Sequence, residues 1–143
     1  MEARNTTAGS RRQGREAALQ VLYLKDVAGT GLDTIPERVW STDPLTGRTR
    51  QFAQRLAEGV AGHQADIDAL IKKYAENWEI GRMAAIDRSV LRLAAYELLH
   101  ETETPINVII NEAVEIAKKY STSESSKFVN GILDKIKAER THG

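Results

Sequence analysis

Residues 83–98 read MAAIDRSVLRLAAYEL, and this stretch decides the fold class. Its apolar side chains recur every three or four residues, at Met83, Ile86, Val90, Leu93, Ala94 and Leu98. That spacing matches the α-helical period and places these side chains on one face of a helix. The stretch therefore predicts a helix that is buried in a protein core.

The same period continues on both sides of this stretch. We expect a first helix that ends near Ala28-Gly29, a short second helix from Asp33 to about Trp40, and one bent helix or two helices over 48–76. Further helices are expected over 106–120 and around 128–136. No segment alternates apolar and polar residues with period two. The sequence predicts an all-α fold of about seven helices.

Local signals suggest where several helices begin. Ser10 and Gln13 have the spacing of a capping box, so we expect residues 1–10 to form a flexible leader before the first helix. Thr104 is expected to cap a helix in which Pro105 is the first residue. Residues 121–126 are rich in Ser and predict a connector before the last helix.

Three glycines lie within otherwise helical patterns. Gly59 and Gly62 interrupt the segment 48–76 and predict a bend or a break. Asn130-Gly131 is ordinarily a turn signal, but apolar residues at helical spacing flank it on both sides. We expect the last helix to continue through Gly131, which would permit a close contact with another helix.

The composition excludes several protein classes. The 143 residues include 20 Lys and Arg, 20 Asp and Glu and no Cys, so disulfides and thiolate zinc sites are absent. No apolar run approaches the roughly 20 residues that span a bilayer. The polar N-terminus is unlike a secretory signal, which favours the cytoplasm.

The net charge of zero conceals an uneven distribution. Residues 1–25 contain five cations and two anions, whereas residues 97–115 contain five acids and no Lys or Arg. We expect the basic and acidic segments to meet different partners.

Catalytic motifs are not found. The sequence lacks a phosphate loop, a dinucleotide-type glycine pattern, a nucleophile elbow and a His-Glu-x-x-His pair. His63, His100 and His142 lie in unlike contexts and are expected to be solvated or capping residues, with no metal site and no cofactor. The carboxylate pair Glu112 and Glu115 leaves only a small hydrolase as a remote alternative.

The basic residues Arg11, Arg12 and Arg15 lie within about one turn of the first helix, and Tyr23 follows about two turns later. Guanidinium groups suit phosphate oxygens and stack on unpaired bases. Three cations in a first turn would oppose the helix dipole, which suggests a functional reason for them. The alternative is an ordinary solvated helix start.

A second basic and aromatic group surrounds the predicted connector. Lys119 and Tyr120 end one helix, and Lys127 and Phe128 begin the next. Lys near a helix C-terminus also suits the helix dipole, and the two rings are more typical of packing than of base stacking.

Four segments together resemble the NusB family of bacterial transcription antitermination factors. They are RRQGREAALQVLY at 11–23, DRSVLRLAAYEL at 87–98, INEAVEIAKKY at 110–120 and SKFVNGILD at 126–134. The resemblance runs in the same order from Arg11 to Ile136, and is weakest over 29–49.

The resemblance implies two packed three-helix bundles in a single domain over 11–140, with no catalytic activity and no cofactor. It implies binding to the boxA element of ribosomal RNA leaders or phage RNA, together with the ribosomal protein that acts as NusE. Other Nus factors and RNA polymerase would complete the assembly. Members of the family occur as monomers and as homodimers, so the sequence allows either state for this protein. The alternative is a helical protein–protein adaptor without specific RNA binding.

The resemblance also implies site residues. The expected RNA-binding residues are Arg11, Arg12, Arg15, Tyr23, Lys119, Glu124, Lys127 and Phe128. Asp87, Glu97 and Glu101 are expected to face the NusE-type partner, whose basic charge the acidic stretch would complement. Gln13 departs from the motif, because some members carry Arg there, and this difference predicts a lower RNA affinity.

Overall fold

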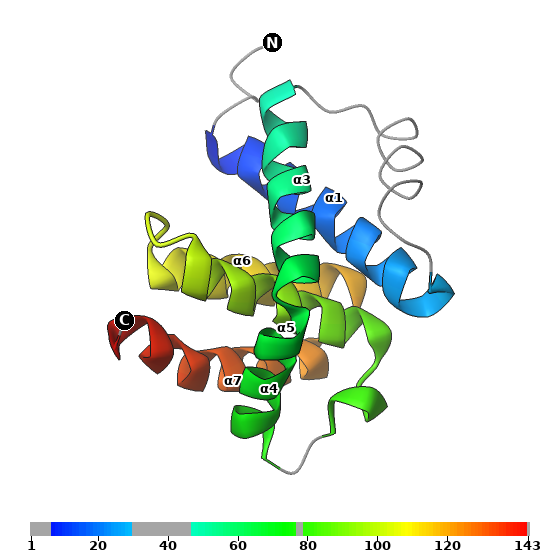
Figure 1. The fold of residues 1–143 in the computed structure, drawn as a ribbon, viewed down its shortest axis with the longest axis vertical. Coiled ribbons are helices and arrows are strands. Elements are labelled where there is room, and N and C mark those ends of the chain that lie inside the picture. Colours follow the sequence, from blue (N-terminus) through cyan, green and yellow to red (C-terminus); the bar gives the residue numbers. More distant parts are fainter. Residues whose placement is uncertain (1–6, 30–46, 77–78, 143) are drawn as a thin grey trace. The chain divides into compact units, whose positions relative to one another are not determined.

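The computed structural model describes residues 7–29, 47–76 and 79–142 (Figure 1). Its elements are α1 (Thr7–Ala28), α3 (Gly47–Gly62), α4 (Gln64–Ala75), the 3-10 helix η2 (Ile80–Arg82), α5 (Ala85–His100), α6 (Ile106–Tyr120) and α7 (Ser123–His142). All the regular elements of these residues are helices, which confirms the all-α prediction. None of these helices is long and apolar enough to cross a membrane. The short helix expected over 33–40 lies outside the described residues.

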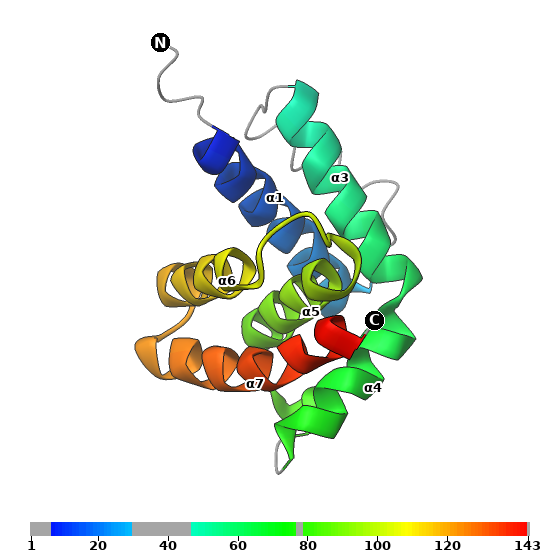
Figure 2. The same cartoon turned by 90° about the vertical axis from the view of Figure 1, so that its left-hand side faces the viewer.

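The chain divides into two compact units, Met1–Gly59 and Val60–Gly143. In the first unit, α1 and the greater part of α3 lie side by side (Figures 1 and 2). The second unit contains α4 to α7. A division into two helical units agrees with what the family resemblance implies.

Helix α5 is at the centre of the second unit. It packs against α4, α6 and α7, and α6 and α7 pack against each other (Figure 2). Every residue from Ser89 to Leu98 is buried, so α5 is covered all round and not on one face alone. This burial confirms the prediction that the helix in residues 83–98 belongs to the core. Leu91, Leu98, Ile109, Leu133 and Ile136 are among its fully buried side chains.

Arg140 near the end of α7 holds the turn between α5 and α6. Its Nε donates to the carbonyl oxygen of Leu98 at 2.7 Å, and its Nη1 donates to that of Thr104 at 2.7 Å. Its Nη2 donates to the carbonyl oxygens of Glu97 at 3.1 Å and Glu101 at 2.9 Å. One guanidinium thus binds four carbonyl oxygens at the end of α5 and in the turn that follows, and two of these oxygens, of Glu97 and Glu101, also accept a backbone N–H.

Three predicted helix starts differ from the structure. Helix α1 begins at Thr7, so Ser10 lies within it and residues 7–9 are not part of a leader. Pro105, with φ −61° and ψ 145°, is itself the N-cap of α6, so Thr104 is not. Helix α7 begins at Ser123, where Thr122 Oγ1 accepts the N–H of Ser125 at 2.9 Å. Neighbouring Ser and Thr residues can each cap a helix, so composition alone does not select one.

The glycines show where the backbone requires a small residue. Gly29 has φ 68° and donates to the carbonyl of Lys25 at 2.9 Å, which ends α1 as predicted. The expected break in 48–76 occurs after Gly62. Helix α7 continues through Gly131, but a Cβ there would meet nothing within 4 Å, so the expected close contact at Gly131 is wrong. Among the described glycines, Gly14 is in close contact instead.

Candidate nucleic-acid interface

In the first unit, three arginines surround the ring of Phe52. The Cζ atoms of Arg11, Arg15 and Arg55 lie 4.2 Å, 5.6 Å and 5.2 Å from the ring centroid. Arg11 and Arg15 belong to α1, whereas Phe52 and Arg55 belong to α3. We call these four residues the arginine cluster. Distances below about 6 Å are those of cation–π contacts, so each guanidinium is attracted to the ring.

The three predicted arginines of α1 differ in exposure. Arg11 and Arg12 are half-buried, and Arg15 is only 3% exposed. The burial of Arg15 leaves little of this side chain for direct contact with RNA. Because α1 begins at Thr7, these arginines also follow the first turn of the helix, so the expected opposition to the dipole is weaker than the sequence suggested.

Tyr23, the other site residue predicted on α1, is 37% exposed. It is two turns along the helix from Arg15 and lies outside the arginine cluster. Its neighbours Leu24 and Val27 are also exposed. A partly exposed aromatic side chain on this helix is of the type on which bases stack.

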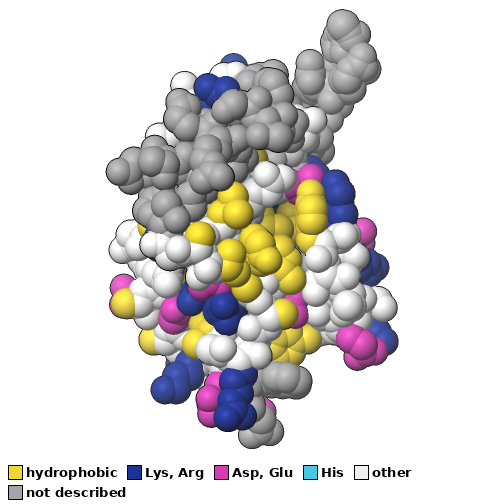
Figure 3. Space-filling model, turned by 90° about the vertical axis from the view of Figure 1, so that its right-hand side faces the viewer, with side chains coloured by type: hydrophobic (Ala, Val, Ile, Leu, Met, Phe, Trp, Pro, Cys, Tyr) yellow, Lys and Arg dark blue, Asp and Glu magenta, His cyan; other side chains and the backbone are white. Residues whose placement is uncertain are grey.

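In the second unit, the two predicted lysines have different neighbours, a carboxylate for Lys127 and an aromatic ring for Lys119. Lys127 Nζ is 3.7 Å from Glu124 Oε2, with both side chains highly exposed. Lys119 is exposed at the end of α6, and its Nζ is 5.2 Å from the ring centroid of Tyr120. Its neighbour Lys118 pairs with Glu115 at 3.5 Å. Figure 3 shows Lys and Arg side chains intermixed with Asp and Glu on one face of the molecule. These exposed pairs offset much of the local positive charge.

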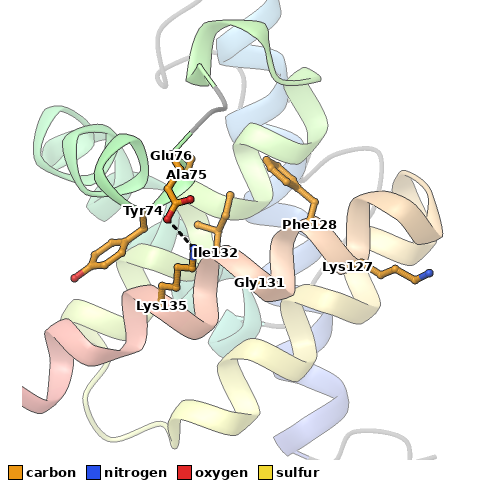
Figure 4. Close-up of a pocket in the computed structure, with 8 residues that line it drawn as sticks. All are labelled: Tyr74, Ala75, Glu76, Lys127, Phe128, Gly131, Ile132 and Lys135. Atoms are coloured by element: carbon orange, nitrogen blue, oxygen red, sulfur yellow. Dashed lines mark hydrogen bonds and ion pairs between the residues drawn. The ribbon is translucent and has the colours of Figure 1, made fainter.

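Phe128 borders a hollow of about 270 Å³ between α4 and α7 (Figure 4). The other lining residues are Tyr74, Ala75, Glu76, Lys127, Gly131, Ile132 and Lys135. Phe128 is half-buried, as predicted, and it leaves α7 in a different direction from Lys127 (Figure 4). Because Gly131 has no side chain, this edge of the hollow stays open. An aromatic ring beside a lysine suits a nucleobase and its phosphate.

The polar groups around this hollow are held by ion pairs and hydrogen bonds. Lys135 Nζ donates to Glu76 Oε2 at 3.2 Å, and the Tyr74 hydroxyl donates to Glu139 Oε2 at 2.6 Å. The hydrogen bond to Glu139 raises the pKa of Tyr74 above its ordinary value, and Glu139 also raises the pKa of Lys73. The hydrogen bond directs the Tyr74 hydroxyl to α7.

Two of the three acids predicted to face a partner are buried. Asp87 is 8% exposed and Glu97 is 2% exposed, whereas Glu101 is half-buried. Asp87 Oδ2 accepts a hydrogen bond from Ser125 Oγ at 2.8 Å, which connects α5 to α7. The burial of Asp87 and Glu97 argues for a role within the second unit. Glu103 and Glu115 are the exposed acids of this stretch.

The structure brings together two histidines that the sequence separates. The rings of His63 and His100 stack with centroids 4.3 Å apart, and Tyr96 stacks on His100 at 4.8 Å. Desolvation, and then the charge of His63, lower the pKa of His100. Across the described ranges, no three His, Cys, Asp or Glu side chains are grouped so that they could hold a metal ion.

Sequence reasoning missed the α3 side of the arginine cluster. Arg48, Phe52 and Arg55 have i, i+4 and i+7 spacing, which places them on one face of a helix. That spacing was available in the sequence, but α1 and α3 are joined by more than fifteen residues, and only the folded chain shows that their faces meet.

These features define a class of protein. The chain is helical, gathers arginines around an aromatic ring in one unit, and combines an aromatic ring with lysines at a hollow in the other, as nucleic-acid-binding proteins do. Residues 12–138 match the model of the NusB family. The chain belongs to the NusB family.

Relatives and solved structures resemble the chain over nearly its full length. The transcription antitermination protein NusB of Elusimicrobium minutum is 46% identical over 137 residues, which are 94% of this chain and 98% of that protein. NusB of T. maritima is 39% identical with a TM-score of 0.83, over 93% of this chain and 97% of that one. A crystal structure of the antitermination factors NusB and NusE in complex with double-stranded RNA contains a chain 27% identical, with a TM-score of 0.85, over 91% of this chain and 97% of that one.

Proposed function

We propose that this protein is a transcription antitermination factor that binds boxA-type single-stranded RNA together with a NusE-type ribosomal protein. It acts in the cytoplasm within an assembly of other Nus factors and RNA polymerase, and it catalyses no reaction. The antitermination role is supported by relatives that are named transcription antitermination protein NusB and match nearly the whole chain. The RNA and NusE roles are supported by the similar chain that was crystallised with both.

The arginine segment of α1 is the observation that carries the RNA part of this proposal. Arg11 and Arg12 reach the surface of the first unit, where the described residues hold seven cations and three anions. A local excess of positive charge attracts phosphate through counterion release, although the whole chain is neutral. Lys119, Glu124, Lys127 and Phe128 are proposed to contact RNA from the second unit, with Phe128 stacking on a base. Tyr23 is proposed to stack in the same way from α1.

The acidic stretch after α5 is proposed to face the basic partner protein. Because Asp87 and Glu97 are buried, Glu101 and the exposed Glu103 are the acids placed to meet it. Asp87 and Glu97 would then shape this region from inside the second unit. Charge complementarity of this kind raises the association rate and depends strongly on salt.

Fluorescence anisotropy with a labelled single-stranded boxA-type RNA tests the proposal. The titration is run at two salt concentrations, with and without a purified NusE-type ribosomal protein, and with a double-stranded RNA of the same length as comparison. We expect weak binding alone, tighter binding with the partner, and a loss of affinity of about tenfold in the double variant Arg11→Gln/Arg12→Gln. A protein that binds the partner but shows no RNA affinity at either salt would instead be the helical adaptor. Equal affinity in the double variant would overturn the assignment of the two arginines.

A further inference from the structure

Phe52 lies directly against the backbone of the arginine segment. A Cβ on Gly14 would be 2.7 Å from Phe52 Cδ2 and 3.4 Å from the carbonyl oxygen of Thr49. Real Cβ atoms do not approach other atoms as closely as 2.7 Å, so the ring occupies the space that a side chain at position 14 would need. Gly14 therefore admits Phe52 between Arg11 and Arg15.

The ring is buried, but two of its three guanidinium neighbours are accessible. Phe52 is 6% exposed, Arg15 lies beneath the surface, Arg11 is half-buried and Arg55 is exposed. Each guanidinium is held by attraction to the ring, which limits the orientations that a long side chain can adopt. The arginine cluster is thus ordered before any ligand arrives.

The arginine cluster also gathers positive charge at one place on the first unit. All three Cζ atoms lie within 5.6 Å of the ring centroid. When a phosphate binds at the surface of the cluster, arginine side chains that the ring already orients lose little conformational freedom. Helix α3 adds further positive charge, since Arg48 lies one turn before Phe52 on the same face.

We propose that RNA phosphate is bound by a surface of both α1 and α3, with Arg55 as a further RNA-contacting residue and Phe52 as the residue that positions Arg11 and Arg55. This inference rests on the proposed function, because it names additional residues of the same RNA site. Arg15 and Gly14 support this surface without contacting RNA. Arg15 packs beside the Phe52 ring, and Gly14 leaves the space that the ring occupies.

Arg55→Gln tests the contact, and Arg50→Gln is its matched control. Both arginines are exposed on α3, but Arg50 is two residues from Phe52 and so points to another side of the helix. With the labelled single-stranded RNA, we expect Arg55→Gln to weaken binding at least threefold and to lower the salt slope by about one unit, while Arg50→Gln matches the unaltered protein. Equal effects of the two substitutions would overturn the proposal.

Two substitutions, Phe52→Leu and Phe52→Tyr, test whether Phe52 positions Arg11 and Arg55 or only contributes to packing. Leu removes the ring, and Tyr keeps it while placing a hydroxyl in a buried site, so both variants lose thermal stability. We expect only Phe52→Leu to lose RNA affinity when both are measured well below their melting temperatures. The Arg11 and Arg55 side-chain Nε–H resonances should also move downfield in Phe52→Leu alone, as the ring current is removed. If RNA affinity follows stability in the two variants, Phe52 is only a packing residue and the proposal is wrong.

The double variant Arg11→Gln/Arg12→Gln distinguishes this inference from the proposed function. If that variant loses RNA affinity while Arg55→Gln and Phe52→Leu retain it, the RNA site lies on α1 alone and the two-helix surface is refuted. If all of these variants retain full RNA affinity, the RNA is bound elsewhere, and both the assignment of Arg11 and Arg12 and this inference are wrong. If the unaltered protein shows no RNA affinity, the RNA-binding part of the proposed function fails as well. The expected result is loss of affinity in all three.

Discussion

Arg92 on α5 holds both carboxylate oxygens of Asp68 on α4. Its Nε donates to Oδ1 at 2.8 Å and its Nη2 donates to Oδ2 at 2.9 Å. The two side chains are 10% and 26% exposed, so the pair is largely removed from water. Two parallel charge-assisted hydrogen bonds fix both the distance and the angle between these helices.

Asp68→Asn is therefore expected to destabilise the protein by about 2 kcal/mol, because it removes the negative charge that faces a mostly buried guanidinium. The measurement is the free energy of unfolding in urea. Asp134→Asn provides the control: Asp134 also pairs with a cation, Lys137, at 2.7 Å, but both side chains are well exposed. That control should cost less than about 0.5 kcal/mol, and similar losses in the two variants would contradict the role assigned to the Asp68 pair.

Arg140→Gln should loosen the turn between α5 and α6. The guanidinium donates four hydrogen bonds to backbone carbonyls, and a glutamine amide can replace only part of them. We expect a loss of about 2 kcal/mol in unfolding free energy and faster hydrogen exchange at the amides of Glu101 and Thr104. Lys137→Gln on the same helix is the control, and unchanged exchange in Arg140→Gln would show that the turn holds without this side chain.

The fold class followed from local pattern, whereas the contacts between helices did not. The 3.6-residue period of 83–98 was enough to predict α5, because burial selects apolar side chains at that spacing. The same pattern could not tell that Gly14, and not Gly131, lies directly against a side chain of another helix. The contact at Gly14 depends on where helices that are distant in the sequence cross, and the local spacing of residues does not predict this.

The candidate site was predictable in part for the same reason. Charge and spacing identified Arg11, Arg12 and Arg15, but Arg15 is buried, with its guanidinium near the Phe52 ring. Glu97 likewise belongs to an acidic stretch in sequence and is enclosed in the structure. In both cases the residue type suggested a surface role, and tertiary packing decided otherwise.

The stacked histidines predict a pH dependence of stability. Because the pKa of His100 is lowered in the folded protein, the unfolded chain binds more protons near and below the ordinary value of 6.5. The resulting stability is fully present above that value and is lost as the pH falls through the folded pKa. Urea unfolding between about pH 7.5 and pH 5.5 should show this decline in the unaltered protein and a weaker decline in His100→Gln.

An NMR titration of the His63→Gln variant tests how far the charge of His63 accounts for the lowered pKa of His100. His63 lowers the pKa of His100 by its charge, after the larger effect of desolvation. The substitution should move the pKa of His100 back toward its ordinary value without restoring it completely, because desolvation remains. A pKa of His100 that does not change would show that the two rings do not interact electrostatically in solution.

Gln13→Arg should strengthen RNA binding. Gln13 is exposed on α1 next to Arg12, at the position where the family resemblance implies that some members carry Arg. A further guanidinium there adds one phosphate contact, so we expect at least threefold tighter binding of the single-stranded RNA and a salt slope steeper by about one unit. Asn111→Arg, at an exposed position in the middle of α6, adds the same net charge elsewhere and controls for general attraction. Because both variants raise the total charge equally, only a local contact can make Gln13→Arg the stronger binder, and equal gains would place the RNA away from this turn of α1.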